Sequence, residues 1–191
     1  MLDQLLHLDE NWFRLINGQW HHPFWDVVLP WWRDKKTWIP LYLLLAFFSI
    51  YRFKQNGIYL LLALIISVGV ADTASSQWLK KSVQRERPCH NAILEKDIRI
   101  LTGCSPSYSF TSSHAANHFA IAVFLFFTVG RVWRWLRWPL IAWAASIAYA
   151  QVYVGAHYPL DVIGGAVLGA FIGWGIAQLY LKWIPHNFKT T

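Results

Sequence analysis

The sequence predicts an all-α membrane helix bundle in a single domain, residues 1–191, and three observations carry this prediction. Hydrophobic residues make up 55% of the 191 residues and 13 are tryptophans, which is too apolar for an ordinary soluble domain. Apolar runs near the ~20 residues that cross a bilayer recur along the chain. Basic residues gather in some of the short connections between these runs, as they do on the cytoplasmic side of membrane proteins.

Five apolar runs approach the length of a membrane-spanning helix, and we expect about five transmembrane helices. The runs are residues 37–53, 57–79, 115–129, 138–155 and 162–181. The third run is short and is expected to depend on interfacial neighbours.

Residues 1–35 are expected to lie at the membrane interface. Apolar residues recur at near-helical spacing in the first two dozen positions, which predicts an interfacial helix with an apolar stripe on the membrane and its acids in water. The stripe comprises Leu5, Leu6, Trp12, Phe13, Ile16 and Trp20. Asp3, Asp9 and Glu10 argue against a cleavable signal peptide. Residues 23–32 are short and contain proline, so a half-inserted aromatic segment is expected there.

Charge predicts the orientation of the chain. The connections after the first and third runs and the C-terminal tail contain seven basic residues and no acid. These residues are Arg52, Lys54, Arg131, Arg134, Arg137, Lys182 and Lys189. The positive-inside rule places these segments and the C-terminus in the cytoplasm, and the 81–113 loop outside. The net charge of +7 is explained by this topology and by an anion site, so no nucleic-acid partner is expected.

Both cysteines, Cys89 and Cys104, fall in the 81–113 loop. An oxidising exterior favours a disulfide between them, which would close a loop of about 15 residues. The alternative is that they are two unrelated small side chains.

Three polar clusters fall at the ends of the apolar runs that the topology brings to one outer rim. They comprise Lys80 with Arg87; Ser112, Ser113 and His114; and His157 with Asp161. Each cluster alone has a structural explanation, such as cations that reach lipid headgroups or a serine that caps a helix. Together, cations and the free N–H groups of a helix start bind an anion. Two histidines, one beside a carboxylate, suit a nucleophile and an acid.

The three segments KKSVQRERP, SFTSSHAAN and YAQVYVGAHYPLD resemble the signature motifs of the type 2 phosphatidic-acid phosphatase (PAP2) superfamily over residues 57–181. The resemblance implies that Lys80, Arg87, Ser112 and Ser113 hold a phosphate. It implies that His157 attacks phosphorus, that Asp161 orients His157, and that His114 protonates the leaving oxygen. No metal or other cofactor is expected, because side chains supply the cations. No carboxylate cluster or Cys/His set with metal-ligand spacing occurs in the sequence.

The sequence departs from the family pattern at a few positions. Thr111 and Ser113 replace a proline and a glycine, and Gln151 stands where the family has an arginine. Gln151 can donate hydrogen bonds to phosphate but brings no charge. Two interpretations remain. A neighbouring cation, Arg85, Lys81 or Arg99, replaces the missing charge, or the chain binds a lipid phosphate without efficient turnover.

The resemblance implies an integral phosphatase of the bacterial inner membrane whose site faces the exterior and whose substrate is a lipid phosphate or diphosphate. Chain size and an outward-facing site favour undecaprenyl diphosphate. Phosphatidylglycerophosphate, phosphatidic acid and lipid A are alternatives within the same class. A lipid-phosphate binding or transport protein is the alternative of another class. The sequence carries no signal for an oligomer.

Overall fold

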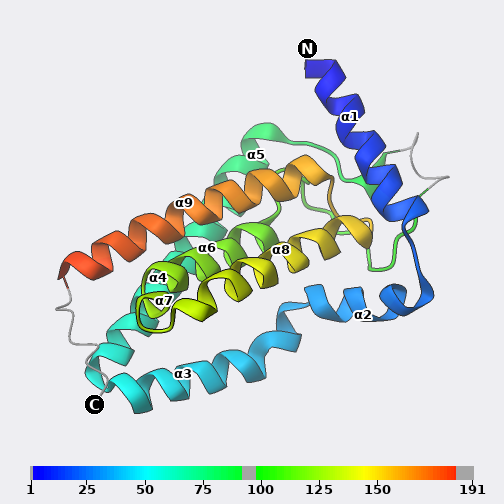
Figure 1. Cartoon of the computed structure of the whole chain (residues 1–191). Helices are drawn as coiled ribbons and strands as arrows, with labels where there is room; N and C mark the ends of the chain where they lie inside the picture. The colour runs from blue at the N-terminus through cyan, green and yellow to red at the C-terminus, as the bar shows by residue number, and fades with distance from the viewer. Residues whose placement is uncertain (1, 92–97, 184–191) are drawn as a thin grey trace.

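The computed structural model describes residues 2–91 and 98–183, and the described residues form a bundle of helices with no strand (Figure 1). The helices are α1 (Leu2–Arg14), α2 (Pro23–Arg33), α3 (Ile39–Phe53), α4 (Gln55–Thr73), α5 (Lys80–Val83), α6 (Ser113–Phe127), α7 (Val129–Val132), α8 (Arg137–Tyr153) and α9 (Pro159–Trp183). A π-helical segment, Ala74–Leu79, joins α4 to α5, and another, Leu15–Gln19, extends α1. The predicted all-α membrane bundle is confirmed.

Each of the five apolar runs corresponds to a helix, but the helices differ in length. Within residues 2–91 and 98–183, three helical stretches are long and apolar enough to cross a membrane, namely Gln55–His90, Ser113–Val132 and Pro159–Trp183. The helices α3 and α8 have 15 and 17 residues, fewer than the ~20 that span a bilayer without adjustment. The count of five membrane spans therefore stays a prediction.

The helix α6 lies at the centre of the bundle and packs against α9, α8 and α4. Its closest neighbour is α9, because Gly165, Gly169 and Gly173 face it at four-residue intervals. A Cβ atom added at Gly169 would lie 2.0 Å from the carbonyl oxygen of Ala116. As expected for small residues at helix contacts in membranes, these glycines let the two backbones approach closely.

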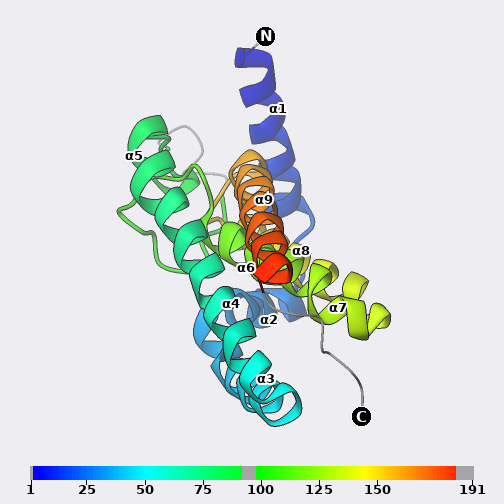
Figure 2. The ribbon, with the colours of Figure 1, turned by 90° about the vertical axis from the view of Figure 1, so that its left-hand side faces the viewer.

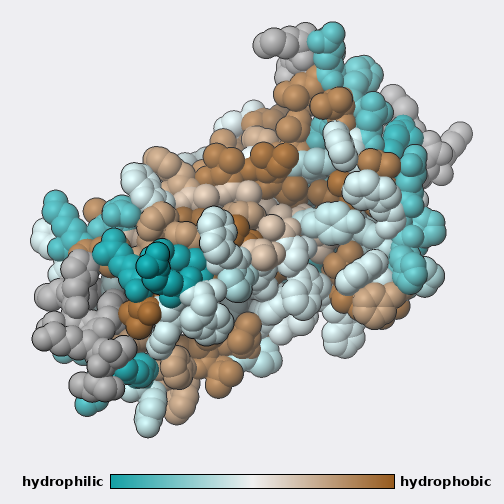
Figure 3. All heavy atoms as spheres, viewed as in Figure 1, coloured by the Kyte–Doolittle hydropathy of each residue, from teal (hydrophilic) through white to brown (hydrophobic). Residues whose placement is uncertain are grey.

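Large apolar side chains cover much of the outer surface. Among them, Leu43 and Phe47 of α3 and Val167 and Phe171 of α9 are all well exposed. Figure 3 shows apolar residues across the middle of one face and hydrophilic residues toward its two ends. A surface of this kind is unfavourable in water and is typical of helices that contact lipid.

The helix α1 is docked on the bundle more deeply than the sequence predicts. Leu5, Trp12 and Trp20 are exposed, but Phe13 is fully buried, and its ring packs edge-on against Tyr158 with centroids 5.3 Å apart. Asp9 is also buried. The expectation that the whole stripe faces the membrane and all the acids face water is therefore wrong for Phe13 and Asp9. The side chains of both residues point from α1 toward the start of α9 and are buried there.

The helix α2 packs along the last turns of α8. Leu29 belongs to a buried apolar cluster with Ala150 and Tyr153, and the indole N–H of Trp32 donates a 2.8 Å hydrogen bond to the hydroxyl of Ser146. These contacts place the C-terminal end of α2 beside the end of α8.

The two ends of the bundle differ in character. At one end, the α3–α4 turn, α7 and the end of α9 come together: Phe53 packs against Trp133, and the hydroxyl of Tyr180 donates to the carbonyl of Asn56. At the other end lie α1 and the junction between α8 and α9 (Figures 1 and 2). The predicted basic connections thus lie at the end opposite to the α8–α9 junction.

Candidate active site

A cavity of about 420 Å³ opens at the end of the bundle that contains the start of α6 and the α8–α9 junction. Five residues from the three sequence motifs line it: Lys80, Arg87, Ser113, His114 and His157. They come from α5, the segment after it, the start of α6 and the α8–α9 junction. The topology therefore brings together side chains that lie up to 77 residues apart in the sequence.

His157 is held from both sides of its ring. Nδ1 lies 3.5 Å from a carboxylate oxygen of Asp161, and Nε2 lies 3.2 Å from Nη1 of Arg87. Pro159 begins α9, so Asp161 falls in the first turn of that helix, four residues after His157. With Nδ1 directed to Asp161, Nε2 is the nitrogen next to Arg87 on the cavity wall.

Asp161 is fully buried and accepts several hydrogen bonds. The hydroxyl of Ser109 and the backbone N–H of Tyr158 both donate to Oδ2, and Arg85 pairs with Oδ1 at 2.8 Å. These donors fix the carboxylate in one orientation.

Burial lowers the pKa of His157 to about 4, against the opposing effect of its hydrogen bond with Asp161. The imidazole is therefore neutral at neutral pH, and an unprotonated ring nitrogen is what a nucleophile requires.

Lys80 and Arg87 are anchored by neutral groups. Nζ of Lys80 donates to the carbonyl oxygens of Tyr108 and Ser109 at 2.8 and 3.2 Å. Arg87 donates through Nε to the carbonyl of Ser107 at 2.7 Å and through Nη1 to the carbonyl of Ala156 at 2.9 Å. Because these partners carry no charge, the two cations are positioned while their charges stay available to an anion.

The start of α6 supplies the second wall. Ser112 is buried and caps the helix, since its hydroxyl accepts a 3.4 Å hydrogen bond from the N–H of Ala115. Ser113 and His114 line the cavity. The first turn of a helix has N–H groups without intrahelical partners, which favour an anion. Ser112 therefore shapes the turn, and Ser113 and His114 face the cavity.

Four of the residues considered as phosphate ligands are absent from the cavity wall, namely Ser112, Gln151, Lys81 and Arg85. Gln151 is fully buried in α8, is absent from the cavity wall, and its amide has no hydrogen-bond partner among the described residues. Lys81 is exposed on α5. Arg85 pairs with Asp9 at 2.6 Å and with Asp161, and its guanidinium lies 4.0 Å from the centroid of the Tyr158 ring. Gln151 and Lys81 are thus outside the cavity wall in this structure, and Arg85 is paired with two carboxylates.

Arg99, the remaining cation considered for this role, pairs with Asp26 of α2. This ion pair joins α2 to the segment that precedes α6.

The motifs also omit residues that the fold brings to the site. Ser109 contacts Asp161 across 52 positions, Asp9 pairs with Arg85 across 76, and Arg33 lines the cavity. Each lies far in sequence from the group that it serves, so no local spacing could have revealed it.

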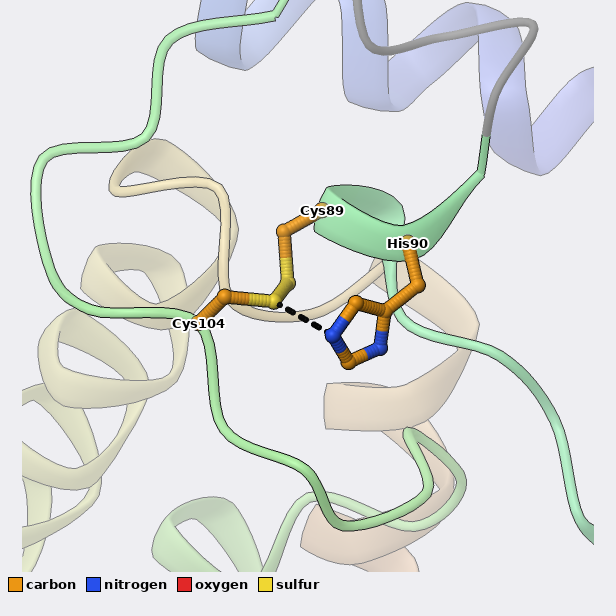
Figure 4. A group of neighbouring side chains, drawn as sticks. All are labelled: Cys89, His90 and Cys104. Atoms are coloured by element: carbon orange, nitrogen blue, oxygen red, sulfur yellow. Dashed lines mark hydrogen bonds between the residues drawn. A yellow bond between two sulfur atoms is a disulfide. The ribbon is translucent and has the colours of Figure 1, made fainter.

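Cys89 and Cys104 form a disulfide that lines the cavity (Figure 4). Nε2 of His90 lies 3.1 Å from the Cys104 sulfur. Metal ligation by cysteine requires a free thiolate, and here both sulfur atoms are bonded to each other. The group is therefore a crosslink that ties the segment after α5 to the loop before α6.

Comparison with known proteins connects these features to one family. The model of the PAP2 superfamily matches residues 56–185. The lipid A 4'-phosphatase of Bacteroides thetaiotaomicron is 30% identical over 91% of this chain and 77% of its own length. An undecaprenyl-diphosphatase of Sulfolobus acidocaldarius is 31% identical over 75% of this chain and 63% of its own length. The crystal structure of a transmembrane PAP2 type phosphatidylglycerolphosphate phosphatase from Bacillus subtilis aligns with a TM-score of 0.71 at 20% identity, covering 96% of this chain and 89% of that one.

Proposed function

We propose how this chain acts from one premise: it belongs to the PAP2 superfamily and is a membrane lipid phosphatase, a phosphoric ester hydrolase. We propose that His157 is its nucleophile. One observation carries this proposal: Nδ1 of His157 faces Asp161, while Nε2 faces Arg87 on the wall of the cavity.

In the first step, Nε2 of His157 attacks phosphorus and forms a P–N bond, while the P–O bond to the lipid breaks. His114 donates a proton to the departing oxygen. Asp161 stabilises the positive charge that develops on the His157 ring. Lys80 and Arg87 bind the non-bridging phosphoryl oxygens.

In the second step, a water molecule attacks the phosphohistidine. His114, now neutral, accepts a proton from that water, the P–N bond breaks, and inorganic phosphate leaves. His157 returns to its neutral form with its Nδ1 still directed to Asp161.

We propose that the substrate is a phosphate monoester of the lipid A class. The relative named lipid A 4'-phosphatase matches over 91% of this chain, whereas the undecaprenyl-diphosphatase matches over 75%. This order reverses the preference drawn from chain size and topology. Undecaprenyl diphosphate is the second candidate, because the identity over its shorter match is equally high at 31%.

We further propose that the site faces the exterior of a bacterial inner membrane, with the C-terminus in the cytoplasm. The basic connections lie at the end of the bundle away from the α8–α9 junction (Figure 1), and that junction includes His157. The positive-inside rule assigns such basic segments to the cytoplasm. The lipid would approach from the bilayer and place its phosphate in the cavity.

The test is phosphate release by the purified protein from lipid A, undecaprenyl diphosphate, phosphatidylglycerophosphate and phosphatidic acid. We expect the highest kcat/KM with lipid A, and a loss of at least about a thousandfold in His157→Ala. His7→Ala is the control, because His7 is exposed on α1, and should match the wild type. Release that survives in His157→Ala would reject the mechanism. Retained binding of these lipids with no release from any of them would instead favour a lipid-phosphate binding or transport protein.

A further inference from the structure

One cation in the cavity belongs to none of the three motifs. Arg33 is the last residue of α2 and lines the cavity together with Lys80, Arg87 and His157. It lies outside residues 56–185, the region that matches the family. A segment that the sequence predicts to rest at the membrane interface therefore contributes a guanidinium to the site.

The Arg33 guanidinium has few partners. Nη1 donates a 2.6 Å hydrogen bond to the hydroxyl of Thr102, and Nε is buried without a hydrogen-bond partner among residues 2–91 and 98–183. Within the same residues, no carboxylate oxygen lies within 4.0 Å of it. The adjacent Asp34 is engaged elsewhere, because its carboxylate accepts from the backbone N–H of Lys36.

Two other arginines near the site, unlike Arg33, form ion pairs with carboxylates. Arg85 pairs with Asp9 and Asp161, and Arg99 pairs with Asp26. A partly buried cation without an ion pair is unfavourable, since only the adjacent Asp34 attracts it from outside contact distance, and gathering it with two more cations adds repulsion. Burial and the neighbouring Arg87 lower the pKa of Arg33 to about 10, which still leaves it charged at neutral pH. A bound anion would relieve both penalties.

The main departure from the family pattern, at Gln151, lies on the part of α8 against which α2 packs. Gln151 occupies the arginine position of the third motif but has no access to the cavity. The adjacent Ala150 packs against Leu29 of α2 in a buried apolar cluster. The turn of α8 that carries Gln151 is thus the surface on which α2 docks, and α2 ends at Arg33.

We propose that Arg33 supplies the positive charge that Gln151 lacks and binds phosphoryl oxygens together with Lys80 and Arg87. The proposal rests on the function proposed above and adds α2 to the substrate site. A guanidinium can offer two N–H donors to adjacent oxygens of one phosphate, as the missing motif arginine would. Nε and the second terminal nitrogen are the donors left for that purpose, since Nη1 contacts Thr102.

The experiment measures binding of orthovanadate, a phosphate analogue, to the purified full-length protein by titration calorimetry, together with kcat/KM on the lipid phosphate that the wild type cleaves best. We expect Arg33→Gln to weaken vanadate binding and to lower kcat/KM, each by at least about tenfold, because a charge-assisted hydrogen bond is lost. Lys36→Gln removes a charge from the same segment outside the cavity wall and should change both by no more than about twofold.

Arg33→Lys keeps the charge but loses the second donor. We expect it to bind vanadate with an affinity between those of the wild type and Arg33→Gln. If Arg33→Gln does not fold, Arg33→Lys decides, and vanadate affinity equal to that of the wild type would overturn the proposal. Thermal melting of each variant without vanadate shows which of them are folded.

Binding and turnover separate the two proposals. A wild type that binds vanadate through Arg33 but releases no phosphate from any lipid would reject the phosphatase function and keep the anion site. A wild type that cleaves lipid phosphate while Arg33→Gln binds vanadate and turns over at the wild-type level would reject the role of Arg33 alone. Absence of vanadate binding to the wild type would also reject it.

Discussion

Asp161 and Arg87 contact opposite nitrogens of the His157 ring, and each contact has its own effect on the imidazole. The carboxylate fixes which nitrogen faces the cavity, and the guanidinium keeps a positive charge beside that nitrogen, Nε2. Burial of the ring disfavours its protonated form. His157 is therefore a neutral imidazole at physiological pH, which the sequence motif alone does not indicate.

The titration of His157 follows from this setting. We expect the ring to remain neutral as the pH falls from 7 to 5 and to gain a proton only near a pKa of about 4. The measurement is ¹⁵N NMR of histidine-labelled protein without substrate, with His157→Ala identifying the resonance. A midpoint at the ordinary value of about 6.5 would show that the ring is solvated and that burial does not control it.

Among single residues, the sequence predicts those that line the cavity well, but it predicts poorly the side chains that surround and position them. Lys80, Arg87, Ser113, His114 and His157 all line one cavity, as motif spacing and topology imply. Gln151 and Arg85 differ from expectation, because motif position fixes a place on a helix but not which neighbouring element packs against it.

The closest contact between helices depends on three glycines of α9. The backbone of Ala116 occupies the space that a side chain at Gly169 would need, and Ser112 and Ala120 do the same at Gly165 and Gly173. This contact also sets the distance between the start of α6 and Asp161, since the N–H of Ser112 donates to the Asp161 carbonyl at 2.9 Å. The packing of α6 on α9 therefore positions two walls of the cavity.

We expect Gly169→Ala to destabilise the protein by about 1–3 kcal/mol, because the new methyl group forces two tightly packed backbones apart. Gly175→Ala is the control on the same helix: nothing lies within 4 Å of a Cβ atom there, and alanine favours helix by about 1 kcal/mol over glycine. Thermal unfolding in detergent compares the two. Equal melting temperatures would contradict the close α6–α9 contact.

The helix α1 is coupled to Asp161, and through it to His157, by Arg85. Asp9 accepts from Arg85 on one carboxylate oxygen and from the N–H of Leu160 on the other, and Arg85 also contacts Asp161. A helix expected to rest on the membrane thus positions the carboxylate behind His157.

Asp9→Asn removes one of the two carboxylate charges that pair with Arg85, the other being that of Asp161. The variant keeps an oxygen that can accept a hydrogen bond from the N–H of Leu160. We expect kcat to fall about threefold to tenfold with little change in KM, because Asp9 acts through Asp161 and does not touch substrate. Asp3→Asn alters an exposed acid of the same helix and serves as the control. A change confined to KM, or the same change in both variants, would exclude a positioning role.

Hydropathy predicts the helices more completely than it predicts the contacts between them. Each apolar run corresponds to a helix within a few residues, because lipid exposure requires apolar side chains on most of the surface. The burial of Phe13 and Asp9 was not predictable, since an amphipathic stripe has the same pattern whether it faces lipid or another helix. The pairing of Cys89 with Cys104 in the structure is a contact within the 81–113 loop that the sequence does predict.

The face in Figure 3 is apolar across its middle, and the described bundle has a cavity at one end and basic connections at the other. This polarity is what the distribution of lysine and arginine along the sequence predicts. It also explains the net charge of +7 without a nucleic-acid partner.

The orientation is tested by fusions at the C-terminus. We expect a C-terminal green fluorescent protein to fluoresce in bacteria and a C-terminal alkaline phosphatase to be inactive, because the first requires the cytoplasm and the second an oxidising exterior. The opposite pattern would place the C-terminus outside and the cavity in the cytoplasm.

A rapid-quench experiment directly tests the transfer of phosphate to His157. The protein is mixed with ³²P-labelled lipid phosphate and quenched in alkali, and the labelled peptide is identified by mass spectrometry. We expect an alkali-stable, acid-labile phosphate on His157 in the wild type and none in His157→Ala. A wild type that turns over the lipid with no such adduct, or one that carries the phosphate on another residue, would contradict it.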